Sequence, residues 1–184
     1  WGNMFYHKKS PYKGYTFRDE VGPQPMPDCV DVEGVQPIPE EQEAYLRELL
    51  TMLDDMEQDA LFIVSPYGLS AEEQHMFRYM EEIVESYGYP FLNMNEHYED
   101  IGIVFEEDYA DYGSHTNAVG AEKCTDFLEQ YLLEHYSFTD KRENAVYESW
   151  DQSYEDWKTE METARETIQE RIMNEDYADV GEEE

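Results

Sequence analysis

The chain has 184 residues, of which 12 are Lys or Arg and 45 are Asp or Glu, so its formal net charge is −33. A surface this acidic repels nucleic-acid phosphates and anionic lipid headgroups, and it argues against both as partners. Aromatic residues make up 15% of the sequence, which gives the chain enough apolar surface to fold as one domain despite its charge. Because no apolar run reaches about 18 residues, we expect no membrane-spanning segment.

Residues 1–38 carry Gly and Pro without a regular period, which predicts an extended arm. The first 18 residues contain four basic side chains and no acidic one: Lys8, Lys9, Lys13 and Arg18. We expect electrostatic attraction to hold this basic arm across the acidic body. The chain opens on Trp1 rather than Met, so we expect a fragment or a processed product.

Helical and strand patterns alternate over residues 39–137. Amphipathic helical spacing alternates with short apolar runs of the kind found in buried parallel strands. Such an alternation predicts strand–helix units with right-handed crossovers, adjacent parallel strands and a three-layer α/β sandwich. In chain order the expected elements are a helix at 40–56, a strand at 60–64, a helix at 70–87, a strand at 91–94 and a helix at 117–136. Ser70 and Glu73 form a predicted capping box at the start of the middle helix.

Residues 138–173 are predicted to form a long amphipathic helix packed on the body. Its apolar stripe follows a three-and-four spacing through Tyr147, Trp150, Tyr154, Trp157, Met161, Ala164 and Ile168. A short coiled coil is the alternative, but aromatic side chains are poor knobs for a regular dimer, so we expect a monomer. Trp150, Tyr154, Trp157 and Met161 are therefore expected to be buried against this chain. Residues 174–184 are predicted to be an acidic, disordered tail.

One polar loop, residues 108–117, combines two carboxylates and an imidazole directly before a helix. A His whose tautomer is fixed by a nearby Asp is half of a nucleophilic relay, because the other ring nitrogen then accepts a proton. His115 is the candidate base. Asp111 and Asp108 are both candidates to orient it. The alternative interpretation is a capped loop whose His is merely exposed.

The motif Asp111-Tyr-Gly-Ser-His115-Thr-Asn117, followed by Gly120-Ala-Glu-Lys-Cys-Thr, resembles the last conserved block of SGNH (GDSL-like) hydrolases. More narrowly it is similar to clostridial surface-associated SGNH-like proteins. The resemblance implies a partial SGNH or flavodoxin-like fold over 39–137, with His115 as base and Asp111 as its orienter. It differs from the family's Asp-x-x-His spacing, since three residues separate Asp111 from His115, so Asp108 stays a candidate.

The resemblance further implies an acyl-ester hydrolase or O-acyltransferase that acts on a cell-surface glycan or a similar ester, in an extracytoplasmic location. The family's nucleophile lies in a Gly-Asp-Ser-like turn after the first strand, and this sequence contains no such turn. We therefore expect the nucleophile and the first strand upstream of Trp1, and the chain alone to be inactive. Ser65, Tyr67 and Asn117 are candidate oxyanion or substrate contacts.

Neither a metal site nor a cofactor is indicated. The two cysteines, Cys29 and Cys124, lack the spacing of a zinc site or a disulfide framework. His97 stands near Glu96 and Glu99, but this group is too small to indicate a metal centre. The second hypothesis, of a different class, is a catalytically inactive SGNH-like domain kept for binding.

Overall fold

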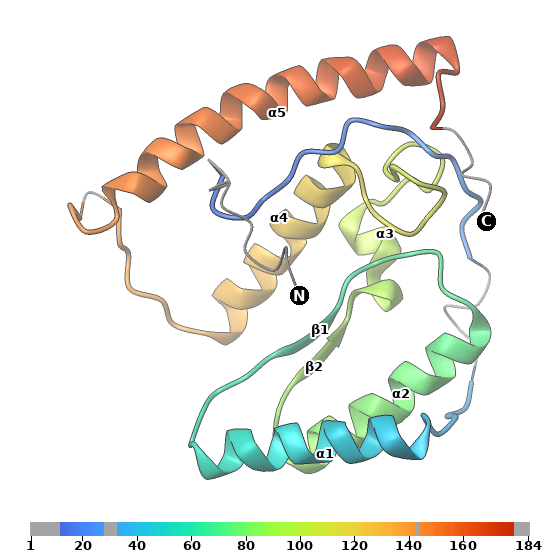
Figure 1. The fold of residues 1–184 in the computed structure, drawn as a ribbon, viewed down its shortest axis with the longest axis vertical. Coiled ribbons are helices and arrows are strands. Elements are labelled where there is room, and N and C mark those ends of the chain that lie inside the picture. Colours follow the sequence, from blue (N-terminus) through green and yellow to red (C-terminus); the bar gives the residue numbers. More distant parts are fainter. Residues whose placement is uncertain (1–11, 28–32, 143, 179–184) are drawn as a thin grey trace, which may run out of the picture. The chain divides into compact units, whose positions relative to one another are not determined.

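The computed structural model describes residues 12–27, 33–142 and 144–178. The chain divides into two compact units (Figure 1). Residues 1–24 and 104–184 form one, called here the terminal unit, because it contains both ends of the chain. Residues 25–103 form the other, called the sheet unit. Residues 12–24 of the expected arm thus fold with the C-terminal half of the chain, whereas the arm residues from 25 onward belong to the sheet unit. In the described part, no helix is both long and apolar enough to cross a bilayer.

A two-stranded parallel sheet lies in the sheet unit. Strand β1 covers Phe62–Val64 and β2 covers Phe91–Asn93, and their register pairs Ile63 with Leu92. Helix α2, Ala71–Ser86, connects the two strands. The predicted parallel pairing is confirmed, although both strands are shorter than expected. The described residues contain this one small sheet, so the architecture is mixed α/β.

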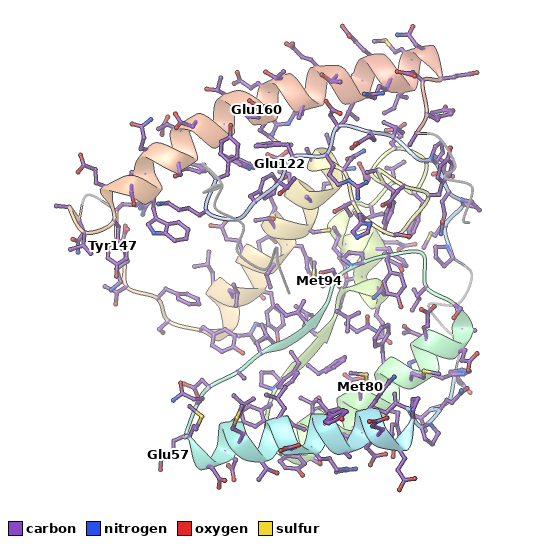
Figure 2. The ribbon with its side chains drawn as sticks, in the orientation of Figure 1. Glu57, Met80, Met94, Glu122, Tyr147 and Glu160 are labelled. Atoms are coloured by element: carbon purple, nitrogen blue, oxygen red, sulfur yellow. The ribbon has the colours of Figure 1, made fainter. Side chains whose placement is uncertain are left out.

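Helices α1, Glu40–Asp55, and α2 share the apolar core of the sheet unit. Ser70 and Glu73 make the predicted capping box at the start of α2, in which Ser70 Oγ accepts from the Glu73 N–H and the Glu73 carboxylate accepts from the Ser70 N–H. Met80, labelled in Figure 2, packs against this core. The buried core residues are Ile38, Leu46, Leu50, Ile83 and Val84.

Two short helical segments follow β2. A 3-10 turn, η1, covers Met94–His97, and α3 covers Tyr98–Ile101. The segment ends at Gly102, whose φ of 74° is the left-handed conformation that Gly adopts without steric cost.

Helices α4, Ala118–His135, and α5, Glu148–Asn174, pack together in the terminal unit. Their shared core consists of Val21, Ala118, Met161, Ala164 and Ile168. Because Val21 belongs to the arm, this part of the arm is held by burial of apolar surface as well as by the expected attraction between charges. The three-layer sandwich would also place α4 against the sheet. Since α4 and the sheet belong to different units, that packing stays a prediction.

The stripe on α5 is only partly buried, which corrects the sequence-based expectation. Met161 is 1% exposed and Trp157 is half-buried, but Trp150 and Tyr154 are each 58% exposed. The described helix also begins at Glu148 rather than at 138. The first turns of α5 have the predicted apolar spacing, but the core of the unit contacts this helix only from Trp157 onward.

Backbone hydrogen bonds hold Val21 and Gly22 of the arm, and Ala178 after α5, within the terminal unit. The Gly22 N–H donates to the Tyr109 carbonyl at 2.8 Å, and the Ala178 N–H donates to the Val21 carbonyl at 2.8 Å. A Cβ at Gly22 would lie 2.4 Å from the Tyr112 nitrogen, so Gly permits this close approach. Residues 175–178 of the expected disordered tail therefore hold defined contacts, whereas 179–184 lie outside the described residues.

Candidate functional site

The candidate site is a hairpin in the loop before α4. Tyr109 and Thr116 pair in an isolated antiparallel bridge, and the turn between them uses a left-handed Gly113 with a φ of 98°. The hairpin folds the chain back on itself, so Asp111 and His115 face each other across the turn. The hairpin therefore brings the two side chains into contact although three residues, rather than the family's two, separate them.

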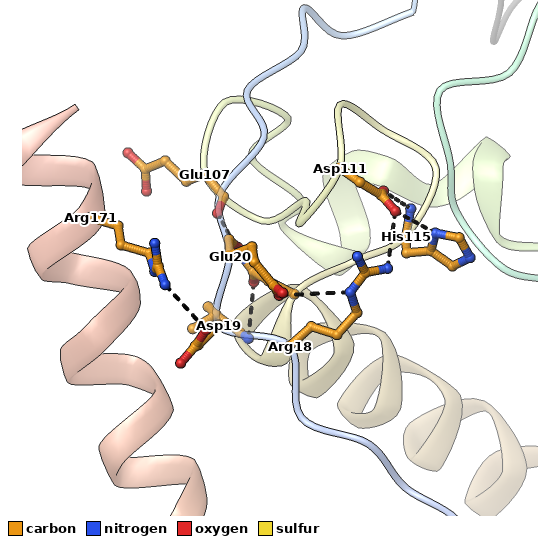
Figure 3. Close-up of polar contacts among 9 residues, drawn as sticks. Arg18, Asp19, Glu20, Glu107, Asp111, His115 and Arg171 are labelled. Atoms are coloured by element: carbon orange, nitrogen blue, oxygen red, sulfur yellow. Dashed lines mark hydrogen bonds and ion pairs between the residues drawn. The ribbon is translucent and has the colours of Figure 1, made fainter. Parts of the chain in front are cut away.

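Asp111 holds His115 at two points. The His115 Nδ1 lies 2.6 Å from Asp111 Oδ2, and the His115 backbone N–H donates to Asp111 Oδ1 at 2.6 Å (Figure 3). A carboxylate accepts hydrogen bonds and cannot donate, so the neutral ring carries its proton on Nδ1. Nε2 then keeps its lone pair. Because the His115 side chain is 68% exposed, a substrate group has access to the ring.

Arg18 completes the arrangement from the arm. Its Nη1 donates to Asp111 Oδ2 at 3.0 Å, and its Nε lies 3.8 Å from Glu20 (Figure 3). The Arg18 carbonyl also accepts from the Ala118 N–H at 2.8 Å, at the start of α4. The arm therefore supplies both a positive charge beside the carboxylate and a backbone contact to the helix that follows it.

These contacts set the protonation of Asp111. Partial burial raises the pKa of Asp111, but it is outweighed by hydrogen bonds from the ring and backbone of His115, with added attraction from the charges of His115 and Arg18. The net result is a pKa below the ordinary value of 3.8. Asp111 is ionised at neutral pH, as the orienter of a base must be.

Asp108, the other candidate orienter, has a structural role instead. It is 1% exposed, and its Oδ2 accepts from Lys123 Nζ at 2.6 Å and from the Val104 N–H at 2.7 Å. Buried charges need this kind of pairing. Asp108 fixes the loop to α4, while Asp111 contacts His115.

Asn117 also turns out to be structural, which corrects its prediction as a substrate contact. Its side chain is fully buried and caps α4 by accepting from the Val119 and Gly120 N–H groups, both at 3.1 Å. Its Nδ2 donates to the Glu107 carbonyl at 2.7 Å. Buried and bonded through both ends of its amide, Asn117 cannot reach a substrate.

Ser65 and Tyr67 belong to the sheet unit, at the carboxyl end of β1. Ser65 is exposed, whereas the Tyr67 hydroxyl donates to Glu73 at 3.0 Å and the Tyr67 N–H donates to Asn95 Oδ1 at 2.9 Å. The Tyr67 donors are therefore committed within their own unit. Because Ser65 and Tyr67 belong to a different unit from His115, their role as oxyanion or substrate contacts stays a prediction.

A buried amide network at the carboxyl end of β2 was not predicted. Asn95 Nδ2 donates to Asn93 Oδ1 at 2.9 Å, and Asn93 Nδ2 donates to Gln74 Oε1 at 3.1 Å. The Tyr98 hydroxyl donates to Asn95 Oδ1 at 2.8 Å. Together with the Tyr67 bond, the network fixes the loop after β1. The signal available in the sequence was a polar Asn-x-Asn directly after an apolar strand.

Other reactive groups do not add to the site. Within the described ranges, no group of three or more His, Cys, Asp or Glu is arranged to hold a metal ion. His97 pairs with Asp100 at 3.1 Å, and Glu96 is bonded to Gln74 and Arg78. Burial, together with the charge of Asp108, raises the pKa of Cys124 to about 12, so its thiol is not a nucleophile near neutral pH.

No family model, no curated protein and no solved structure matches this chain.

Proposed function

We propose that this chain carries the base half of an SGNH-type acyl-ester hydrolase or O-acyltransferase. His115 is the base and Asp111 its orienter, and the nucleophilic serine comes from outside these 184 residues. The observation that carries the proposal is the two-point contact between Asp111 and His115, which leaves Nε2 free on an exposed ring. The substrate is an ester on a glycan or similar polymer.

The chemistry follows from the tautomer. Nε2 of His115 takes the proton from the serine hydroxyl as its oxygen attacks the ester carbonyl, and Asp111 stabilises the imidazolium that forms. The same proton then passes from Nε2 to the departing alkoxide, leaving the acyl group on the serine. In hydrolysis water attacks this acyl-enzyme, and in transfer a sugar hydroxyl does. His115 again accepts the proton of the attacking group and returns it to the serine oxygen as the bond between the acyl group and the serine breaks.

The fold that we propose for the whole enzyme is a three-layer sandwich. Two observations support it: β1 pairs with β2 in parallel, and helix α2 connects the two strands, as in a strand–helix–strand unit. We place the first strand and the serine turn in the segment outside these 184 residues. That strand would pair with the two-stranded parallel sheet and extend it. Helices would then cover both faces of the enlarged sheet, as in other parallel sheets.

A second candidate is a catalytically inactive SGNH-like domain that binds a ligand. The absence of a Gly-Asp-Ser motif from the 184 residues and the exposed aromatic side chains of α5 favour it. The two candidates differ in whether any serine is activated by His115.

Labelling with a fluorophosphonate probe separates them. The probe reacts with a serine only when a base activates it. We expect the full-length product of the reading frame to be labelled on a serine outside these 184 residues, and His115→Ala to abolish labelling. A full-length product that the probe leaves unlabelled would favour the binding domain.

A further inference from the structure

An open groove with aromatic walls lies at the start of α5, within the terminal unit. Its volume is about 160 Å³, roughly that of one small ring-shaped ligand group. Figure 2 marks the beginning of this helix with Tyr147. The groove is lined by Tyr12, Lys13, Trp150, Ser153, Tyr154 and Trp157.

Exposure of the aromatic rings sets this groove apart from the core. Trp150 and Tyr154 are each 58% exposed, and they lie one turn apart on the same face of α5. The Tyr154 and Trp157 rings are nearly parallel, with an interplanar angle of 10° and centroids 6.0 Å apart. Rings held in this way offer apolar faces to a ligand at a low cost in side-chain entropy.

Cationic groups lie directly beside the rings. Lys13 Nζ is 5.3 Å from the centroid of Trp150 and also donates to Ser149 Oγ at 2.9 Å. Lys158 Nζ is 5.0 Å from the centroid of Tyr154 and forms an ion pair with Glu155 Oε1 at 2.8 Å. Both are cation–π contacts, and they place positive charge and hydrogen-bond donors at the rim of an apolar surface.

The charges select the class of ligand. The Lys13 ammonium disfavours a basic ligand in the groove, whereas the net charge of −33 disfavours a polyanion on the molecule as a whole. A neutral ligand incurs neither repulsion. It must also present flat apolar faces to the rings and oxygen atoms to Lys13, and the pyranose units of a neutral polysaccharide have both.

We propose that this groove binds a neutral glycan chain by stacking sugar rings on Trp150 and Tyr154, with Lys13 donating to a sugar oxygen. The inference goes beyond the ester chemistry, because it depends on no property of His115. If the ester chemistry also holds, this glycan is its natural polymer substrate.

Calorimetric titration of the 184-residue chain tests the proposal. The probes are cellohexaose and chitohexaose, at millimolar concentration, with oligogalacturonate and a proline-rich peptide as competitors of other classes. We expect at least one neutral oligosaccharide to bind, and Trp150→Ala and Tyr154→Ala each to weaken binding by about tenfold or more. Trp150→Phe keeps a ring and should retain part of the affinity.

Val146→Ala is the matched control, since Val146 is 80% exposed just before α5 and does not line the groove. His115→Ala should leave binding unchanged, which separates this test from that of the ester chemistry. Thermal melts of the Trp150 variants should match the parent, because the side chain is exposed. Absence of binding to both neutral oligosaccharides, binding of only the anionic oligosaccharide or the peptide, or binding unaffected by Trp150→Ala would each overturn the proposal.

Discussion

Asp111 contacts His115 through both of its carboxylate oxygens: Oδ2 lies 2.6 Å from the ring Nδ1, and Oδ1 accepts a hydrogen bond from the backbone N–H, also at 2.6 Å. The second contact fixes the backbone from which the ring projects, so the ring orientation does not depend on a single flexible side-chain bond. Arg18 holds the same carboxylate from the opposite segment of the chain at 3.0 Å. The orientation of the His115 ring is therefore fixed by contacts within the terminal unit.

The first prediction concerns the ring tautomer of His115. In the neutral imidazole we expect the proton on Nδ1, visible in ¹⁵N NMR, because the Asp111 carboxylate can only accept there. Asp111→Asn should shift the population toward the Nε2–H form, while Asp108→Asn should leave it unchanged. Assignment uses His115→Gln. A predominant Nε2–H form in the parent chain would contradict the geometry.

A second prediction follows from the lowered pKa of Asp111. A carboxylate with a depressed folded-state pKa adds stability that is present above its unfolded pKa, near 3.8, and is lost as the pH falls through the folded value. The difference in free energy of unfolding between the parent and Asp111→Asn should thus shrink as the pH falls from about 5 to below about 4. Urea denaturation at several pH values measures it. If this free-energy difference instead grew toward low pH, the pKa of Asp111 would be raised by folding rather than lowered.

The third prediction concerns the buried Asp108–Lys123 pair. Lys123→Met leaves the carboxylate buried beside a single backbone donor, and we expect a loss of about 3 kcal/mol, the low end for broken buried pairs, because Lys123 keeps 30% exposure. The double variant with Asp108→Asn should be more stable than the sum of the single losses implies. Disrupting the exposed Asp140–Arg142 pair is the control and should have no measurable effect. Strict additivity would argue that the two side chains do not interact.

A fourth prediction contrasts two residues of the α5 stripe. Met161 is 1% exposed, so Met161→Ala should cost about 2–5 kcal/mol of unfolding free energy. Trp150→Ala, at 58% exposure, should change it by no more than about 0.5 kcal/mol. Chemical denaturation followed by circular dichroism compares them. Equal losses would indicate that Trp150 is buried in solution.

The local elements of the fold followed from the sequence because their causes are local. The capping box at Ser70 and the apolar spacing of α1, α2 and α4 depend on neighbouring residues, and their predicted bounds agree with the structure within two residues. The α5 stripe shows the limit of this reasoning. Periodicity identifies which face of a helix is apolar but not how much of that face meets another surface, so Trp150 and Tyr154 were wrongly expected to be buried.

The site required tertiary information. Spacing alone left Asp108 and Asp111 equivalent, and the choice depends on Lys123 and Val104, which bind Asp108. Arg18 lies 93 residues before Asp111, and no local pattern links them. The only hint in the sequence was the expectation that the basic arm is attracted to an acidic body. Arg18 does pair with an acidic residue of the body, Asp111, whereas Lys8 and Lys9 lie outside the described residues.

Hydrolysis of a chromogenic acetyl ester tests the central claim most directly. We predict that the 184-residue chain has no activity above background, that the full-length product is active, and that His115→Ala lowers its kcat/KM by about a thousandfold or more, with Asp111→Asn also strongly impaired. Asp140→Asn, at an exposed site away from the hairpin, is the control. An active full-length protein that loses less than about tenfold on His115→Ala would contradict the assignment of His115 as the base.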